Sequence, residues 1–514
     1  MIEKKIFTPE DFGAVADGIT DDGLAINAAI NEAAKCSGIV KFAENAVYFV
    51  KNGTYSKGDI ITSDPGEMTA FRLQNADGVV LKGSNTTIIV GGVILYFSIS
   101  GCKDITLDGF VFETYPHSAF RGRLVSVCHE TVSAVIKTDY EIPFEGNEHY
   151  YCDYEKGQNP YCFAMPDDQW RNHLYLKKIE RNQKENEYTV WFDTSHFTRS
   201  GLRRVSHSNC DIIMPTPNLA HFGRSFLIHS SSNVQIKNCN IKEGPMFLGA
   251  IKGNKGEIFF NNVKMCVEKD QTIPMLAWRD GYHCKDNRGA IHWKNCEIGR
   301  LYDDAFNISC ICLLIDGQPE SNVLSLKNLE DEGRYYEVVV GDVLSVYNTF
   351  EGYAYCELNP ITEVISQEGA ELIVRLKNPI STVDREHTRV MFDSLSSPGS
   401  TIEDCYVEGT VRIRGPITVK NTRFEKLLMM WTENETHIEG PVPHDMLFEN
   451  CSFKGVYPVE GRYLDNFFSF RTVMAWPGIA QYKLKNIRLV NCEYDPKYLY
   501  IEEGNDVKIL NTDK

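Results

Sequence analysis

The sequence has no long apolar run and no excess of positive charge. No stretch of its 514 residues approaches a membrane span, and no apolar signal core follows the first six residues. These features predict a cytoplasmic protein, or an exported one whose signal has been removed. With 53 basic against 70 acidic residues and a net charge of −17, neither a nucleic acid nor an anionic membrane is expected as a partner.

The 16 cysteines lack the spacing of a disulfide framework or a metal site. No Cys-x-x-Cys pair or His–Cys cluster occurs and no acidic loop has calcium-ligand spacing, so no metal or other cofactor is expected. Unpaired cysteines in this number are typical of a reducing compartment. Four of them share one position of a repeat, which predicts small apolar side chains stacked inside the fold: Cys239, Cys296, Cys451 and Cys492.

That repeat is a short pattern of apolar residues around an asparagine, and part of it recurs every twenty-odd residues. A strand–turn–strand unit with such a period indicates a solenoid. Short β-rich runs between residues 39 and 112, broken by Gly, Asn and Asp, are consistent with earlier coils of the same kind. The repeat therefore predicts an all-β fold, a parallel β-helix. Copies begin at Ile236, Phe260, Trp293, Phe448 and Leu489.

A short amphipathic helix is expected near the N-terminus. Residues 24–34 carry two isoleucines four positions apart, which places them on one helical face. Asp21 or Asp22 is expected to cap this helix and Gly38 to end it. Such a helix would cover the open end of the β-helix, where strand edges are otherwise unpaired.

The coil pattern stops twice, and each interruption is rich in alternating strands. We predict a small antiparallel β-barrel inserted at each place, so that the two barrels wall a pocket on one face of the solenoid. The second interruption contains strand-like runs at 335–346 and 371–376. The expected division is 1–120 for the cap and first coils, 121–212 for the first barrel, 213–310 for the catalytic coils, 311–393 for the second barrel and 394–514 for the last coils.

Three aspartates stand at nearly the period of the repeat. Asp280 precedes Asp303 and Asp304 by 23 and 24 residues, which places them on neighbouring rungs roughly 5 Å apart. Carboxylates this close repel, so at least one pKa should rise. Adjacent residues of a regular strand face opposite sides, so a bulge or turn is expected at Asp303. Aromatic neighbours of the kind that sugars prefer accompany them: Trp278, Tyr282, Tyr302 and Phe306.

The opening Asp11-Phe12-Gly13-Ala14 resembles the start of many right-handed parallel β-helix carbohydrate enzymes. The central region resembles glycoside hydrolase family 110, the inverting α-1,3-galactosidases. That resemblance implies an exo-acting hydrolase that removes terminal α-1,3-linked galactose with inversion and without a cofactor. The expected partners are such a carbohydrate and, as an open alternative, a second copy in a homodimer. The matching motifs are Gly244-Pro245-Met246-Phe247-Leu248, Asp280-Gly281-Tyr282-His283, Arg288-Gly289 and Asp303-Asp304-Ala305-Phe306-Asn307.

Glycoside hydrolysis needs a carboxylic acid to protonate the leaving oxygen and a carboxylate to activate water. We assign Asp280 as the acid and Asp303 with Asp304 as the water-activating pair; the reverse assignment stays open. Inversion requires a separation of ~6.5–9.5 Å, which neighbouring rungs reach only if the side chains splay. The substrate-binding candidates are Trp278, Arg279, His283, Tyr302, Asn307, Arg412, Arg414, Trp431 and Glu433.

Each candidate also has a plainer interpretation. The aspartates can be turn residues that cap coils, His283 can be structural, and Arg412 with Arg414 can neutralise the aspartates instead of lining the cleft. A polygalacturonase-like enzyme on the same fold is one rival, although its Gly-His-Gly motif is missing and an acidic chain suits uronates poorly. A non-catalytic β-helix that binds glycans is the other.

Overall fold

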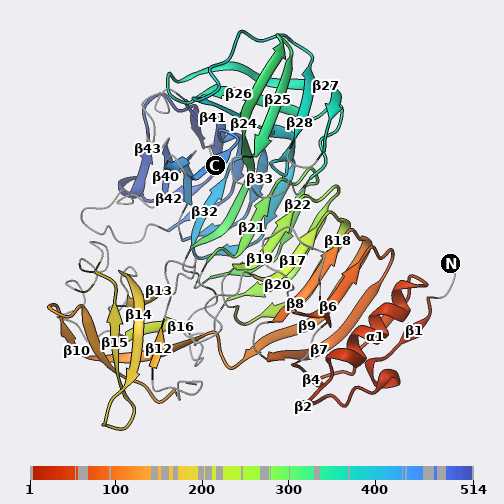
Figure 1. Cartoon of the computed structure of the whole chain (residues 1–514), viewed down its shortest axis with the longest axis vertical. Coiled ribbons are helices and arrows are strands. Elements are labelled where there is room, and N and C mark those ends of the chain that lie inside the picture. The colour runs from red at the N-terminus through yellow and green to blue at the C-terminus, as the bar shows by residue number, and fades with distance from the viewer. Residues whose placement is uncertain are drawn as a thin grey trace.

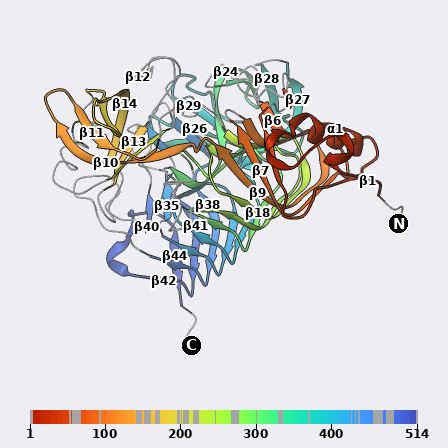
Figure 2. The same cartoon turned by 90° about the horizontal axis from the view of Figure 1, so that it is seen from below.

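The computed structural model is a parallel β-helix with a capping helix and two antiparallel inserts (Figure 1). Successive coils stack from the N-terminal cap to the C-terminal rungs, which confirms the all-β solenoid predicted from the repeat (Figure 2). Within the described ranges, no helix has the length and apolarity needed to cross a membrane. The structure describes residues 4–51, 54–55, 68–91, 94–140, 149–151, 161–165, 172–194, 199, 202, 211–215, 224–244, 247–266, 277, 279–299, 301, 303–328, 336–368, 371–425, 427–430, 432–434, 437–454, 468–471 and 482–511.

The helix α1 (Gly23–Ala34) covers the N-terminal end of the β-helix, and its apolar face is buried in the main core. The side-chain amide of Asn27 donates to the carbonyl of Ala70 at 2.7 Å and accepts from the backbone N–H of Arg72 at 3.1 Å. Both partners lie in β6 (Met68–Gln74). The helix therefore satisfies backbone groups of a rung as well as covering apolar side chains.

The predicted ends of this helix are partly wrong. Asp22 occupies the N-cap position, but its carboxylate accepts from the backbone of the preceding turn at 2.7 and 3.2 Å instead. Asp21, the other candidate, accepts from the N–H of Gly23 at 3.1 Å. Gly38 does not adopt a left-handed cap; a side chain there would lie 2.9 Å from the carbonyl of Lys5. Close approach of the first strand therefore requires this glycine.

The repeated asparagines mark one bend in each coil of a 19-stranded parallel sheet. Their φ angles lie between 52° and 54°, a left-handed conformation that asparagine tolerates better than most residues. Their side chains also form a ladder, in which the amide of Asn262 donates to Asn238 at 2.9 Å. The sequence repeat is therefore a turn signal. Its positions are Asn238, Asn262, Asn295, Asn450 and Asn491.

Replacing Asn262 by alanine is expected to lower the free energy of unfolding by about 1–2 kcal/mol, because alanine resists the left-handed conformation and cannot join the ladder. Urea unfolding followed by circular dichroism measures the change. Asn262→Gly is the matched control, since glycine removes the ladder bond but accepts the backbone angle. Equal losses for the two variants would mean that the backbone conformation does not matter here.

The cysteine that follows the asparagine points into the coil. Cys239, Cys296 and Cys451 are at most 3% exposed and belong to the main core, and Cys492 packs against that core in a late coil. The predicted cysteine stack is confirmed. One asparagine–cysteine pair thus encodes both a turn and an inward-facing side chain, which explains why the repeat is visible in the sequence.

A second sheet carries the face on which the aspartates lie. Its register places Leu227, Ala250, His283, Asn307 and Arg412 in one row across five neighbouring strands. The row changes from apolar to polar at His283, so the polar chemistry is concentrated on the last three strands. The parallel strands after β6 are β8 (Ile94–Ser100), β17 (Arg224–His229), β19 (Phe247–Lys252), β21 (Tyr282–Lys285), β24 (Asp304–Glu320) and β32 (Thr410–Ile413).

The first insert is an antiparallel sheet whose pairings run in a closed circuit, from β10 through β11, β15, β14, β13 and β16 back to β10. Closure of this kind is what a barrel requires. The domain bounds 121–212 stay a prediction. The strands of the circuit are β10 (Ala119–Cys128), β11 (Ser133–Lys137), β13 (Tyr161–Met165), β14 (Asn172–Arg181), β15 (Glu187–Phe192) and β16 (Asp211–Pro215), and β12 (His149–Tyr151) pairs with β14 outside it.

A buried carboxylate fixes the point where the chain enters this insert. Glu243 has no exposed surface and accepts from the backbone N–H of Ser118 at 2.9 Å. A hydrogen bond of 2.7 Å joins it to Nδ1 of His117, and the hydroxyl of Tyr96 donates to its carbonyl at 2.7 Å. These contacts attach the first turn of the insert to the solenoid.

The second insert continues directly from a solenoid strand, because β24 runs through both. Its pairings also close a circuit, from β24 through β25, β28, β27, β26 and β29. The strand expected over 335–346 is wrong for residues 336–342, because the strand begins only at Val343. The Asp342 carboxylate accepts from the N–H of Val339 at 2.9 Å in the turn that precedes it. Residue 335 lies outside the described residues. The bounds 311–393 stay a prediction. The added strands are β25 (Val323–Asn328), β26 (Val343–Asn348), β27 (Tyr353–Ser366), β28 (Leu372–Leu376) and β29 (Thr388–Met391).

Candidate active site

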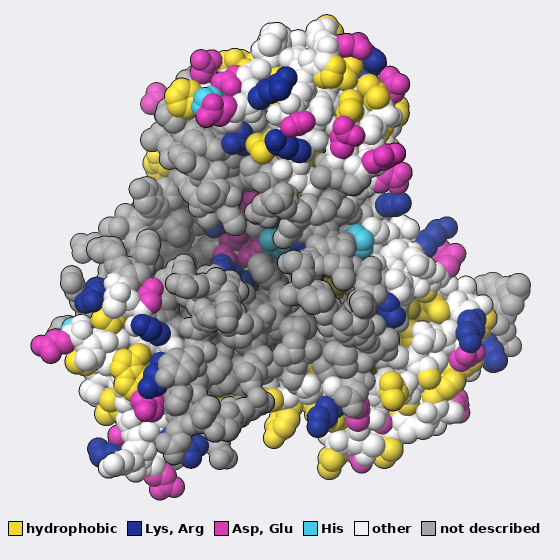
Figure 3. All heavy atoms as spheres, in the orientation of Figure 1, with side chains coloured by type: hydrophobic (Ala, Val, Ile, Leu, Met, Phe, Trp, Pro, Cys, Tyr) yellow, Lys and Arg dark blue, Asp and Glu magenta, His cyan; other side chains and the backbone are white. Residues whose placement is uncertain are grey.

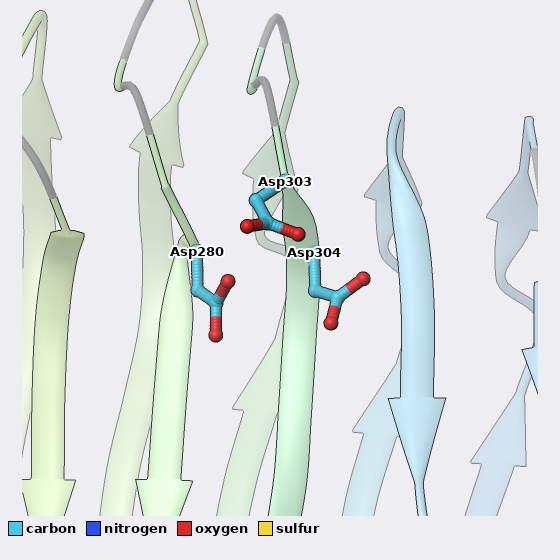
Figure 4. Close-up of side chains that lie close together, drawn as sticks. All are labelled: Asp280, Asp303 and Asp304. Atoms are coloured by element: carbon cyan, nitrogen blue, oxygen red, sulfur yellow. The ribbon is translucent and has the colours of Figure 1, made fainter. Parts of the chain in front are cut away.

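Three carboxylates meet at the start of two neighbouring strands, as their spacing predicts. Asp280 lies two residues before β21, Asp303 immediately before β24, and Asp304 is the first residue of β24. Figure 4 shows their side chains on one face, with the Asp303 carboxylate between the other two in this view. One oxygen of each lies within 4.8 Å of an oxygen of the others.

A bend and a bulge let the adjacent Asp303 and Asp304 face the same side, which the sequence predicted. Asp303 lies in a bend, and the pairing of β24 with β32 shifts register between Asp304 and Phe306. The extra residue, Ala305, turns into the core and has no exposed surface. Gly281 of the neighbouring rung makes room for it, since a side chain there would lie 2.8 Å from the Ala305 carbonyl. The close approach of the bulge therefore helps to explain why glycine follows Asp280.

Of the three aspartates, Asp280 has the pKa best suited to proton transfer near neutral pH. Burial, and then the negative charge of Glu439, raise the pKa of Asp280 to about 6, although nearby cations oppose the rise. A hydrogen bond of 2.6 Å joins its Oδ2 to Nδ1 of His283. Burial holds the pKa of His283 well below its usual value, and the charge of Lys285 adds to this. His283 is therefore neutral where Asp280 titrates.

The other two aspartates each pair with an arginine. Arg279 lies 3.2 Å from Oδ2 of Asp303, and Nε of Arg412 lies 3.0 Å from Oδ2 of Asp304. Burial and the charge of Asp280 raise the pKa of Asp303, while the two arginines oppose that rise. Three carboxylates at this distance are also the kind of group that holds a metal ion. Here the two arginines already offset the charge of two of them.

A fourth carboxylate, Glu439, lies next to this cluster and was missed from the sequence. It accepts from Nζ of Lys285, from the side-chain amide of Asn307 at 3.2 and 3.3 Å, and pairs with Arg414 at 3.2 Å. Lys285 lies two residues after His283 on the same strand face, so alternation along β21 gave a signal for it. No local signal marks Glu439, which is 154 residues away from Lys285.

The structure changes the expected roles of two polar candidates. Arg414 is 1% exposed and pairs with Glu439, so it is too deeply buried to line the cleft. Asn307 is 5% exposed and is engaged by Glu439 and Lys285. Arg279, His283 and Arg412 do lie with the aspartates.

The prediction that aromatic side chains next to the aspartates face the sugar is wrong for Tyr282 and Phe306. Tyr282 and Phe306 are each 1% exposed and stack inside the coil with ring centroids 5.1 Å apart. Because side chains alternate along a strand, the inward neighbours of His283 and Asn307 cannot reach the cleft. Trp278, Tyr302 and Trp431 lie outside the described residues, as does the side chain of Glu433.

Charged and histidine side chains gather in a hollow near the middle of the face shown in Figure 3. In the site described above, cations and carboxylates are equal in number. Arg279 pairs with Asp303 and Arg412 with Asp304, and both Lys285 and Arg414 pair with Glu439. Asp280 is the remaining carboxylate, and its neighbour His283 is neutral. The arrangement can hold one exchangeable proton beside compensated carboxylates.

Two curated relatives are similar to this chain. The α-1,3-galactosidase B of Bacteroides thetaiotaomicron is 22% identical over 417 residues, which cover 76% of this chain and 65% of the relative. The α-1,3-galactosidase A of Akkermansia muciniphila is 24% identical over 383 residues, which cover 70% and 60%. The chain thus spans less than two thirds of the length of these relatives. They confirm the resemblance to α-1,3-galactosidases that the sequence motifs predicted.

No family model matches the chain. Among solved structures, the hyperthermoactive exopolygalacturonase of Thermotoga maritima aligns with a TM-score of 0.42 at 10% identity, covering 100% of this chain and 93% of its own. The polygalacturonase of Erwinia carotovora aligns with a TM-score of 0.37 at 9% identity, covering 95% and 94%. The strand pairings given above define the fold.

Proposed function

We propose that this chain is an exo-acting glycoside hydrolase that removes terminal α-1,3-linked galactose with inversion. The convergence of Asp280, Asp303 and Asp304 carries the proposal, because one carboxyl there has a pKa of about 6 beside two carboxylates paired with arginine. The similarity to two α-1,3-galactosidases supports the choice of sugar. Figure 1 shows an antiparallel insert on either side of the strands that carry the site, an arrangement suited to a chain end.

In the proposed reaction, protonated Asp280 donates its proton to the glycosidic oxygen. The bond between that oxygen and C1 of galactose breaks, and its electron pair stays on the oxygen. Water forms the new bond to C1 from the opposite face and gives its proton to the Asp303–Asp304 pair. The products are β-galactose and the shortened oligosaccharide, and exchange with solvent restores both protonation states.

The separation of the carboxylates does not itself support inversion. One oxygen of each carboxylate lies within 4.8 Å of one oxygen of the others, whereas the ~6.5–9.5 Å typical of inverting enzymes separates whole carboxyl groups. Inversion is proposed from the resemblance alone, and the anomer released first decides it.

Proton NMR of galactose-α-1,3-galactose incubated with the protein tests the proposal directly. Early appearance of the β-galactose signal is the expected result. Early appearance of the α-galactose signal would instead show that the enzyme retains the anomeric configuration. No release of galactose, together with activity on other α-glycosides, would contradict the assignment of galactose as the sugar that is removed. Binding without hydrolysis of any glycoside would make the chain a glycan-binding module.

The charge balance of the site leads to a second expected result. Each of the four cations described there already pairs with a carboxylate, so a uronate would have to compete with Asp303, Asp304 or Glu439 for a charge partner in a partly buried site. We expect kcat/KM for an α-linked galacturonide to be lower than for the matching galactoside by ~10²-fold or more, since 1.36 kcal/mol corresponds to tenfold. Equal rates on the two substrates would favour the polygalacturonase-like alternative.

A further inference from the structure

The side chain of Glu439 contacts residues on or next to the three strands that carry the site. It arrives on β37 (His437–Gly440), which pairs antiparallel with β24 so that Ile311 lies opposite Glu439. Its carboxylate contacts Lys285 on β21, Asn307 on β24 and Arg414 beyond β32. The side chain is only 16% exposed, so this contact forms within the fold rather than on its surface.

Glu439 is poorly suited to be a catalytic base itself. Both of its oxygens accept hydrogen bonds, from Lys285 on one side and Asn307 on both. Burial alone would raise its pKa, but the charges of Lys285 and Arg414 outweigh burial and hold the pKa of Glu439 well below its usual value. It is therefore a permanent negative charge next to the aspartate cluster.

We propose that Glu439 and Lys285 are a positioning pair for Asp280, in which the glutamate favours the protonated aspartate and the lysine opposes it. This inference rests on the proposed function only in treating Asp280 as the acid. The pair lies close to Asp280 in the fold: Lys285 follows His283 by two residues on the same face of β21, Asn307 lies opposite His283 in the register, and His283 hydrogen-bonds Asp280. Removing either member of the pair should change how readily Asp280 holds its proton.

The other charged groups around Asp280 do not cancel the opposite effects of Glu439 and Lys285 on its protonation. The first influence on its pKa is burial, the second is the negative charge of Glu439, and three cations act in the opposite sense. Loss of the glutamate charge and loss of the lysine charge should therefore move the titration of Asp280 in opposite directions. The groups that face Asp280 are Arg279 and Asp303 from the turns, Asp304 from β24, His283 and Lys285 from β21, Arg412 from β32 and Glu439 from β37.

The test compares Glu439→Gln with Lys285→Met in the full chain. The alkaline limb of the pH profile of kcat/KM on galactose-α-1,3-galactose should move to lower pH in the first and to higher pH in the second, each by roughly one pH unit. Glu439→Asp keeps the charge and should leave the limb near its original place. The exposed Glu386→Gln is the matched control and should not move it.

A second readout does not require activity. In protein labelled with ¹³C at aspartate carboxyls, the Asp280 signal is assigned by its absence from Asp280→Asn, and its titration should show the same opposite shifts. An unmoved titration, or shifts in the same direction for both variants, would overturn the positioning pair. If the wild-type chain releases no galactose while the titrations shift as expected, the proposed function fails and the positioning pair stands.

Discussion

Asp280→Asn is expected to lower kcat/KM for galactose-α-1,3-galactose by about 10²–10⁴-fold, the range that a general acid contributes. Asparagine keeps the shape of the side chain and its hydrogen bond to His283 but cannot supply a proton. Binding of galactose should remain within about threefold of wild type, because the charge partners Arg279 and Arg412 contact the other two aspartates. Initial rates and calorimetric binding of galactose measure the two effects.

The leaving group distinguishes an acid from a base in this variant. A dinitrophenyl α-galactoside needs little protonation, so an acid variant should hydrolyse it with a much smaller loss than it shows on the disaccharide. Equal losses on both substrates would instead assign Asp280 as the base, the alternative that the sequence left open. Asp316→Asn, at an exposed position of the same strand as Asp304, is the matched control and should leave both rates unchanged.

The scaffold was predictable because its signals are local. An asparagine in a left-handed turn followed by an inward-facing cysteine recurs along the solenoid. A pair such as Asn238 and Cys239 therefore indicates both the position of the turn and a side chain of the core. The aspartates were predictable for the same reason, since their spacing is nearly one coil. The bulge followed from the alternation of side chains, which forbids Asp303 and Asp304 on one face of a regular strand.

Contacts between distant coils were not predictable. Glu439 reaches Lys285 because β37 adds to β24 in antiparallel fashion, and nothing near Glu439 in the sequence records that pairing. The pairing of Arg414 with Glu439 was missed for the same reason. The prediction that Tyr282 and Phe306 contact the sugar failed for a different reason. Their inward orientation followed from the same alternation, but the preference of sugars for aromatic side chains was given more weight.

The pH dependence of the reaction should follow Asp280. Its pKa is raised to about 6, first by burial and then by Glu439, so the acid is protonated below pH 6 and loses its proton above it. If Asp280 is the acid, kcat/KM falls tenfold per pH unit above about pH 6 and is ~10²-fold lower at pH 8 than on its plateau. If it is the base, kcat/KM rises through the same pH instead. A profile from pH 4 to 9, with Asp280→Asn lacking that limb, decides between them.

Folding stability changes in the same pH range and must be separated from catalysis. Burial raises the pKa values of Asp280, Asp286 and Asp393 to about 6, above the value of 3.8 for an ordinary aspartate. A carboxyl whose pKa is higher in the folded state stabilises the fold at low pH, and that contribution is lost as the pH rises through about 6. Circular dichroism at each pH, and recovery of the rate on return to pH 5, show whether the loss at pH 8 is deprotonation of a folded enzyme. A loss that tracks unfolding rather than a single titration would contradict the assignment of this limb to Asp280.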